Sequence, residues 1–449
     1  MLPARDFFPE LVASQKSGTA RGIGSVCSAH RIVVEAAFAQ ALQDGLPALI
    51  ESTVNQVNQF GGYTGLTPKA WADFLGMVAA ETGFPRDRLI MGGDHLGPYP
   101  WRTERADLAM KKARDLVAAS IHAGFTKIHL DASMPLGGDS VDVRGALDPR
   151  LVAQREAELA AAAEEAFNES RSARSGGWPP AYVIGTEVPA PGGLSAAAEP
   201  AGQEGQPLLP LTRVDDLLES VSLCKSAFHE RGLQDAWMRV CAVVAQPGVE
   251  YGDQEVRPYD RARAARLCEA ARLLPGIVLE GHSTDYQTPD RLRQLVEDGV
   301  AILKVGPALT FALRECLFSL ELIERELMQG TVPADQSDLR GTLERAMIAE
   351  PRHWKDYYVG SDSQKRFARA FSLSDRSRYY WSQPDVAASI ERLFTNLRRT
   401  AIPWTLVSQF LPLHSAAVRE RRLGPDPREL VRESVRLVLE CYSAASRGV

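Results

Sequence analysis

The stretch LIMGGDHLGP at residues 89–98 decides how this sequence folds. A short apolar run bounded by glycines is typical of a buried strand, and this strand ends in Asp94 and His95, just before a Gly-Pro turn signal. Charged side chains are costly inside a core, so both residues are expected either at the open end of the strand or deeply paired, and the Gly-Pro signal favours the open end.

Two further stretches have the same design. IGTEVP at residues 184–189 contains Glu187, and IVLEGHSTD at residues 277–285 contains Glu280 and His282. Each combines a short apolar strand with a carboxylate or an imidazole at its end. We therefore expect one site that is built from three strand ends.

The composition is that of a globular protein. With 449 residues, 45% of them hydrophobic, the chain can form one large domain with additions or two to three smaller domains. Its net charge of −6 gives no basic field, so neither nucleic acid nor an anionic membrane is an expected partner.

No apolar run approaches the roughly 20 residues of a membrane span, and residues 1–15 lack a signal-peptide core, so a cytoplasmic location is expected. The six cysteines lack C-x-x-C spacing, which argues against a zinc ribbon or a disulfide framework.

The order of the apolar runs predicts an α/β fold, a (β/α)8 barrel. Each of eight strands is followed by a helical pattern, and near-continuous apolar strands suit a parallel sheet covered on both faces. The expected strands lie at residues 22–30, 48–54, 89–98, 127–133, 182–188, 239–246, 276–282 and 301–306. A doubly wound open sheet is the alternative. Polar residues at nearly all strand ends favour the barrel, because an open sheet concentrates its site at one switch point.

The barrel is expected to occupy residues 1–335. Between residues 189 and 210 the sequence is rich in Gly, Ala and Pro, which predicts a flexible loop above the site. Residues 336–449 are expected to form a helical C-terminal region that packs on the barrel.

Three strand-end residues are candidates for a divalent-metal site. His95 and His282 offer neutral nitrogens and Glu187 offers an anionic oxygen, which leaves a position for substrate. Zinc, manganese and magnesium all remain open. His30 is a weaker candidate, and His129 lies in the middle of a strand, where a structural histidine is as plausible as a ligand.

Asp94 is the first candidate for general acid/base catalysis on a substrate hydroxyl. Neighbouring strand residues point to opposite sides, so Asp94 is not expected to bind the same ion as His95 unless a turn intervenes. Glu280, Asp131 and Asp285 compete for this role.

Polar and basic residues elsewhere are candidates for substrate binding. An amide-rich loop with Asn55 and Gln59 suits a polyol, and Asp285 lies at a strand end. Lys304 fits a phosphate, a Schiff base or a buried ion pair, whereas Arg376 and Arg378 suit a phosphate. No G-x-x-x-x-G-K-[ST] loop occurs, so phosphoryl transfer from ATP is not expected.

Long motifs resemble the accessory-subunit family of tagatose-bisphosphate aldolase, the GatZ/KbaZ-like proteins. The resemblance covers almost the whole chain, and an insertion near residues 196–207 is longer than the family pattern. The motifs are GIGSVCSAH (22–30), IESTVNQVNQFGGYTG (50–65), GGDHLGP (92–98), KIHLDAS (127–133), YVIGTEVP (182–189), EGHSTDYQTP (280–289), LKVGPALTFALRE (303–315), SDRSRYYW (374–381) and SQFLPL (408–413).

The resemblance implies a barrel related to the class II, metal-dependent aldolases. It implies a metal at His95, Glu187 and His282, with Asp94 as proton carrier, and a phosphorylated ketohexose as ligand. Some members resemble epimerases that convert D-tagatose 6-phosphate into D-fructose 6-phosphate in galactitol-type catabolism. Others resemble non-catalytic partners of a class II aldolase catalytic subunit. The intact set of acid, imidazole and lysine residues favours the epimerase, and a homo-oligomer is left open.

Overall fold

Eight parallel strands close into a barrel in the computed structural model, which describes residues 3–143, 145–173, 178–185, 209–329 and 335–447. β1 and β10 pair with each other and close the sheet, so the predicted (β/α)8 barrel is confirmed and the open sheet is excluded. The strands are β1 (Ile23–Val26), β2 (Ala48–Thr53), β3 (Leu89–Leu96), β4 (Lys127–Leu130), β5 (Ala181–Ile184), β6 (Val240–Val244), β9 (Val278–Gly281) and β10 (Val300–Val305).

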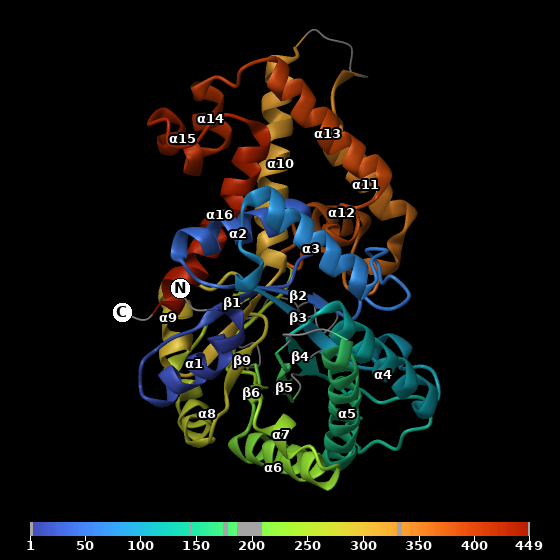
Figure 1. Cartoon of the computed structure of the whole chain (residues 1–449). Coiled ribbons are helices and arrows are strands. Elements are labelled where there is room, and N and C mark those ends of the chain that lie inside the picture. Colours follow the sequence, from blue (N-terminus) through green and yellow to red (C-terminus); the bar gives the residue numbers. More distant parts are fainter. Residues whose placement is uncertain (1–2, 144, 174–177, 186–208, 330–334, 448–449) are drawn as a thin grey trace.

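A helix follows each barrel strand and covers the sheet from outside (Figure 1). These helices are α2 (Arg31–Asp44), α3 (Pro68–Thr82), α4 (Ala106–Ala123), α5 (Pro149–Ala173), α6 (Val214–Glu230), α8 (Arg261–Leu273), α9 (Pro289–Glu297) and α10 (Pro307–Leu327). Local signals set their starts: the Thr67 side chain caps α3, with proline in its first turn. None of the helices in the described part of the chain is long and apolar enough to span a membrane.

A helix at the N-terminal end of the described chain and a short hairpin are among the elements that were not predicted from the sequence. Helix α1 (Ala4–Lys16) buries its apolar side chains in one cluster with residues from the first half of several barrel strands. This cluster includes Phe7, Phe8 and Leu11 of the helix and Ile23, Leu49 and Ile90 of the strands. Because α1 covers the end of the barrel where the strands begin, a site has room at the opposite end. The second element is a short hairpin, β7 (Glu250–Tyr251) and β8 (Val256–Arg257), which follows β6.

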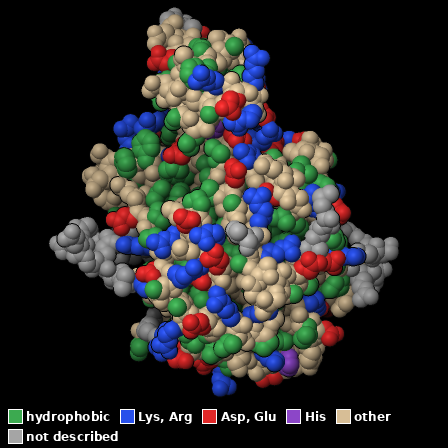
Figure 2. Space-filling model, turned by 90° about the vertical axis from the view of Figure 1, so that its left-hand side faces the viewer, with side chains coloured by type: hydrophobic (Ala, Val, Ile, Leu, Met, Phe, Trp, Pro, Cys, Tyr) green, Lys and Arg blue, Asp and Glu red, His purple; other side chains and the backbone are tan. Residues whose placement is uncertain are grey.

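Most of the C-terminal helices stand above the barrel, beside the upper half of α10 (Figure 1). They are α11 (Leu339–Ala349), α12 (Asp362–Phe371), α13 (Pro384–Arg399), α14 (Trp404–Phe410) and α15 (Pro412–Arg419). A cavity of about 490 Å³, lined mainly by apolar side chains, lies between α10, the α14–α15 pair and the last helix. Figure 2 shows hydrophobic side chains gathered in the upper half of this face, with acidic and basic side chains interspersed below them.

The last helix, α16 (Pro427–Ser446), returns to the barrel. It packs against α2, α9, α10 and β1. Tyr442 lies over Gly24 of β1, where a Cβ atom would be 3.2 Å from the tyrosine Cβ, and its hydroxyl donates to the Thr284 carbonyl (2.8 Å). This helix is therefore part of the helical shell. The expected division of the chain at residue 335 stays a prediction.

We predict that Gly97→Ala destabilises the barrel next to the site. A Cβ atom at Gly97 would lie 1.6 Å from the Asp131 carbonyl oxygen, so the ends of β3 and β4 must move apart. Overpacking of this kind costs about 1–3 kcal/mol. Urea denaturation measures the free energy of unfolding, and Gly424→Ala is the matched control because a Cβ atom there meets nothing within 4 Å. Equal stability of the two variants would contradict the prediction.

Candidate functional site

A cavity of about 120 Å³ opens at the carboxyl ends of the barrel strands. The predicted residues that line it are Asn55, Asp94, His95, His282, Asp285, Lys304 and Arg378. They come from the ends of β2, β3, β9 and β10 and from the segment after α12, so two of the three predicted stretches, 89–98 and 277–285, meet at one cavity. Glu187 and most of the expected 189–210 loop lie outside the described residues.

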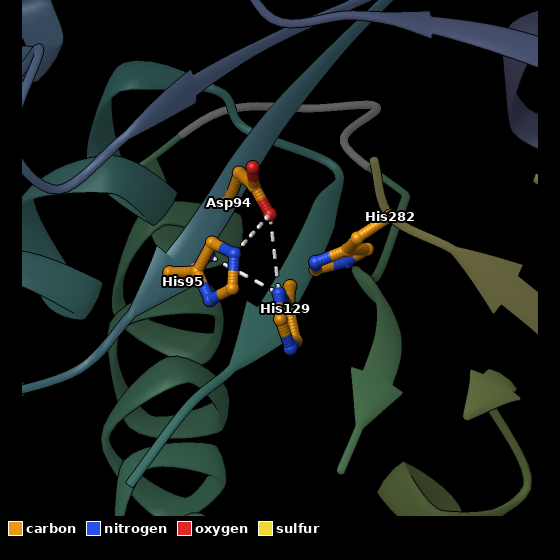
Figure 3. A group of neighbouring side chains, drawn as sticks. All are labelled: Asp94, His95, His129 and His282. Carbon is orange, nitrogen blue, oxygen red and sulfur yellow. Dashed lines mark hydrogen bonds and ion pairs between the residues drawn. The ribbon is translucent and has the colours of Figure 1, made fainter. Parts of the chain in front are cut away.

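Four buried side chains form a compact group at this cavity, and three of them, Asp94, His95 and His282, line it. Asp94, His95, His129 and His282 each offer one possible metal-binding atom, and these atoms all lie within 4.8 Å of one another (Figure 3). A buried group of one carboxylate and three imidazoles matches the ligand chemistry of a transition-metal ion.

Asp94 and His95 face the same cavity although they are neighbours on one strand (Figure 3). His95 has a φ of 49°, and the pairing of β3 with β4 shifts register between Gly93 and Leu96. This irregularity breaks the alternation of a regular strand. Asp94 is therefore close enough to share an ion with His95, contrary to the expectation for a regular strand.

The ring of His95 is fixed by Asp131. Nδ1 of His95 donates to a carboxylate oxygen of Asp131 (2.7 Å), so Nε2 carries the lone pair whenever the ring is neutral. Burial would lower the pKa of His95, but Asp94 and Asp131 raise it above its usual value, so the ring takes up a proton readily when no metal is bound. Burial alone would raise the pKa of Asp131, but the hydrogen bond and the charge of His95 hold it below its usual range. A carboxylate behind a histidine is the usual support of a metal-binding imidazole. Asp131 is thus better suited to position His95 than to act on a substrate.

His282 has the same kind of support from Glu280. Nε2 of His282 donates to a Glu280 carboxylate oxygen (3.0 Å), which leaves the lone pair on Nδ1. Burial lowers the pKa of His282 to about 4, so its ring is neutral at physiological pH. Glu280 is fully buried beneath the cavity and, like Asp131, supports a histidine.

The structure favours a positioning role for His129. Nε2 of His129 donates to the Gly185 carbonyl (3.0 Å), while Nδ1 lies 3.2 Å from the His95 backbone nitrogen and 3.1 Å from Asp94. Both ring nitrogens therefore have partners within the protein. Among the described residues, His95 and His282 are the better candidates for nitrogen ligands of a metal, and Asp94 is the candidate for an oxygen ligand. The role of Glu187 stays a prediction.

A buried network of charges lies directly below the histidines. The Lys304 ammonium group is 2.8 Å from both Glu51 and Asp94. Lys127 is 2.7 Å from Glu51 and 2.6 Å from Glu280. Sequence analysis missed Glu51 and Lys127, although a charged residue inside an apolar strand was a usable signal.

This network decides the charge states of the site. Burial would raise the pKa of Asp94, but Lys304 and His95 hold it well below its usual range. Burial would lower the pKa of Lys304, but Asp94 and the other acidic groups nearby hold it well above its usual value. Lys304 is therefore an ammonium ion in an ion pair, and the alternative of a Schiff-base lysine is not supported.

The rim of the cavity carries the groups for a polar, anionic ligand. Arg378 lines it together with Asn55, Tyr63 and Tyr379, and its guanidinium donates to the Tyr379 hydroxyl (3.1 Å). Sequence analysis missed the two tyrosines, which a reading of the quoted motifs for phenol groups would have included.

Two predicted residues lie elsewhere. Arg376 donates to the His353 carbonyl (2.7 Å) and packs on the Tyr357 ring, and Gln59 donates to the Lys112 carbonyl (2.9 Å). Neither belongs to the described lining of the cavity. Their substrate-binding role stays a prediction that the geometry does not favour.

We predict that Asp131→Asn weakens zinc binding about 10- to 100-fold, because loss of a supporting carboxylate has this effect on metal sites. His95→Ala removes a ligand and should weaken binding more. Competition with a chromogenic chelator measures both affinities. His122→Ala, on the exposed side of α4, is the matched control. Unchanged zinc affinity in Asp131→Asn would contradict the assignment.

We predict that Glu156 makes the protein less stable as the pH rises. Its carboxyl group accepts from Cys224 Sγ (2.7 Å) and from the Gly185 N–H (3.3 Å), and burial raises its pKa to about 8. Unfolded chains release this proton near pH 4.5 and folded chains near pH 8, so between these values the unfolded state gains about 1.4 kcal/mol per pH unit. Urea unfolding across this window should show a smaller decline for Glu156→Gln. Equal slopes would refute the prediction.

Comparison with known proteins confirms the resemblance drawn from the motifs. A family model described as D-tagatose-1,6-bisphosphate aldolase subunit GatZ/KbaZ-like matches residues 8–447. The chain is 45% identical over 433 residues to the D-tagatose-1,6-bisphosphate aldolase subunit GatZ of Salmonella heidelberg (strain SL476), covering 96% of this chain and 97% of that one. A crystal structure of a probable tagatose 6 phosphate kinase from Sinorhizobium meliloti 1021 is 44% identical, with a TM-score of 0.83 and coverage of 95% and 100%. The chain therefore belongs to the GatZ/KbaZ-like family of D-tagatose-1,6-bisphosphate aldolase subunits.

Proposed function

We propose that this protein is a metal-dependent epimerase that acts on carbon 4 of D-tagatose 6-phosphate and forms D-fructose 6-phosphate. The observation that carries the proposal is the complete set of Asp94, His95, His282 and Lys304 around one cavity. A protein that only stabilised a partner would need neither supported imidazoles nor an ionised carboxylate at the strand ends.

A divalent cation fits the residues present. His95 Nε2 and His282 Nδ1 would hold it, with an oxygen from Asp94 or Glu187, and imidazole nitrogen favours zinc over magnesium. When bound, such an ion polarises the carbonyl and hydroxyl oxygens of a ketose.

Asp94 is the residue placed to move the proton. Cleavage of the C3–C4 bond leaves its electron pair on the ketone fragment as an enediolate and turns the C4 hydroxyl into an aldehyde, releasing the hydroxyl proton. Lys304 keeps Asp94 ionised to accept this proton. A carboxylate held so strongly ionised is a weak base, so proton transfer is expected to accompany bond cleavage rather than precede it. The aldehyde group then rotates so that it presents its opposite face to the enediolate. The C3–C4 bond re-forms on that face, and Asp94 returns the proton to the C4 oxygen.

The rim residues are suited to retain the fragment between these two steps. Arg378 is expected to hold the 6-phosphate, and Asn55 and the tyrosines are expected to contact hydroxyl groups. An anchored phosphate lets the aldehyde rotate without leaving the cavity.

The relatives favour a second function more directly than the first. They are named as subunit GatZ of D-tagatose-1,6-bisphosphate aldolase, which supports a role as the non-catalytic partner of a class II aldolase catalytic subunit. In that role the chain would raise the stability or activity of the partner without turnover of its own.

We predict that the purified chain converts D-tagatose 6-phosphate into D-fructose 6-phosphate without release of triose, and that a chelator stops the reaction. Incubation with Zn²⁺, Mn²⁺ or Mg²⁺, with both products followed separately, tests this. Asp94→Asn should lower kcat about 10²- to 10⁴-fold, the usual contribution of an acid/base group. Lys111→Ala, on the exposed face of α4, is the control.

The opposite result is equally clear. No turnover with any metal, together with a gain in stability or activity of a co-expressed class II aldolase, would overturn the epimerase and leave the partner function.

A further inference from the structure

The Asp285 carboxylate occupies two backbone N–H donors at the carboxyl end of the barrel strands, a position that suits an anion. It follows β9 and lines the cavity, with 2% of its surface exposed. One of its carboxylate oxygens accepts from the backbone N–H groups of Gly306 (3.0 Å) and Ala308 (2.8 Å), at the start of α10. Burial raises its pKa to about 6, so Asp285 is still ionised at neutral pH.

This position matters because of its place in the barrel. β9 and β10 are the seventh and eighth strands, and barrels that bind phosphate often do so with the loops after these strands and a helix N-terminus. Here the N–H groups that would hold a phosphate already hold the chain's own carboxylate. A phosphate at this place would lose both donors and would lie beside a like charge.

The cation available for a phosphate comes from the C-terminal segment instead. Lys304 and Arg378 are the lysine and arginine among the described lining residues, and Lys304 is paired with Glu51 and Asp94. Within the described part of the chain, Arg378 makes its hydrogen bonds to backbone carbonyls and to the Tyr379 hydroxyl, with no carboxylate among these partners. The described lining therefore contains one cationic side chain, that of Arg378, which is available to bind a phosphate.

We propose that Asp285 determines specificity: it accepts a hydroxyl group at the ligand end next to α10 and rejects a phosphate there. The ligand is then a ketose with one phosphate, which Arg378 holds, and not a bisphosphate. This inference rests on the proposed binding of a phosphorylated ketose.

The test is to remove the carboxylate that accepts from the Gly306 and Ala308 N–H groups. In Asp285→Ser these groups are exposed to the cavity, and we expect inorganic phosphate to bind at least tenfold more tightly than to the wild type. The affinity for D-fructose 1,6-bisphosphate relative to D-fructose 6-phosphate should rise at least tenfold as well. Isothermal titration calorimetry measures all three ligands.

Two variants separate the causes. Asp285→Asn keeps an oxygen that can accept from both N–H groups, so it should gain less phosphate affinity than Asp285→Ser. In an Arg378→Gln background, which removes the other phosphate subsite, the gain from Asp285→Ser should persist.

Two results would overturn the inference. One is a cooperatively unfolding Asp285→Ser that binds phosphate no more tightly than the wild type does. The other is a wild type that binds the bisphosphate as tightly as the monophosphate. If the wild type fails to turn over D-tagatose 6-phosphate while Asp285→Ser gains phosphate binding, the epimerase fails and the role of Asp285 stands.

Discussion

The buried charges of Glu51, Asp94, Lys127, Glu280 and Lys304 are the constraint on which the site depends. Two ammonium groups face three carboxylates, and none of the five residues is more than 5% exposed. Breaking one pair in such a network leaves an uncompensated charge in a medium that cannot solvate it. The network therefore fixes β2, β3, β4, β9 and β10 relative to one another. Its excess negative charge also favours a cation above it.

Much of the fold could be predicted because periodicity and strand-end chemistry are local properties. All eight strands, the helices between them and the shared cavity follow from such patterns. The pairing of Glu51 with Lys127 and Lys304 could not be derived, since it depends on which strands become neighbours and on their register. The orientation of His95 likewise depends on a positive φ at a residue that is not glycine. Helix α1 was missed because its apolar residues are explained only by the open barrel end that they cover.

The different positions of Arg376 and Arg378 could be predicted only in part from the sequence. Arg376 and Arg378 stand in one motif, yet Arg378 reaches the cavity and Arg376 binds the His353 carbonyl. The buried Arg314 of α10 holds this segment, because its guanidinium contacts Asp375 (2.7 Å) and the Ser372 carbonyl. A tertiary anchor therefore helps to decide which arginine faces the cavity.

The return of α16 to the barrel has a consequence for synthesis. The strand that closes the barrel ends at Val305, but the helix that covers β1 and contacts Thr284 begins only at Pro427, so it leaves the ribosome well after the barrel strands. A nascent chain can pair β10 with β1 while the groove between α2 and α9 is still uncovered. The apolar residues of that groove then stay exposed to solvent until α16 has been synthesised. A premature stop just before Pro427 would thus leave every described lining residue of the cavity in place and still expose apolar surface of the barrel, which favours aggregation.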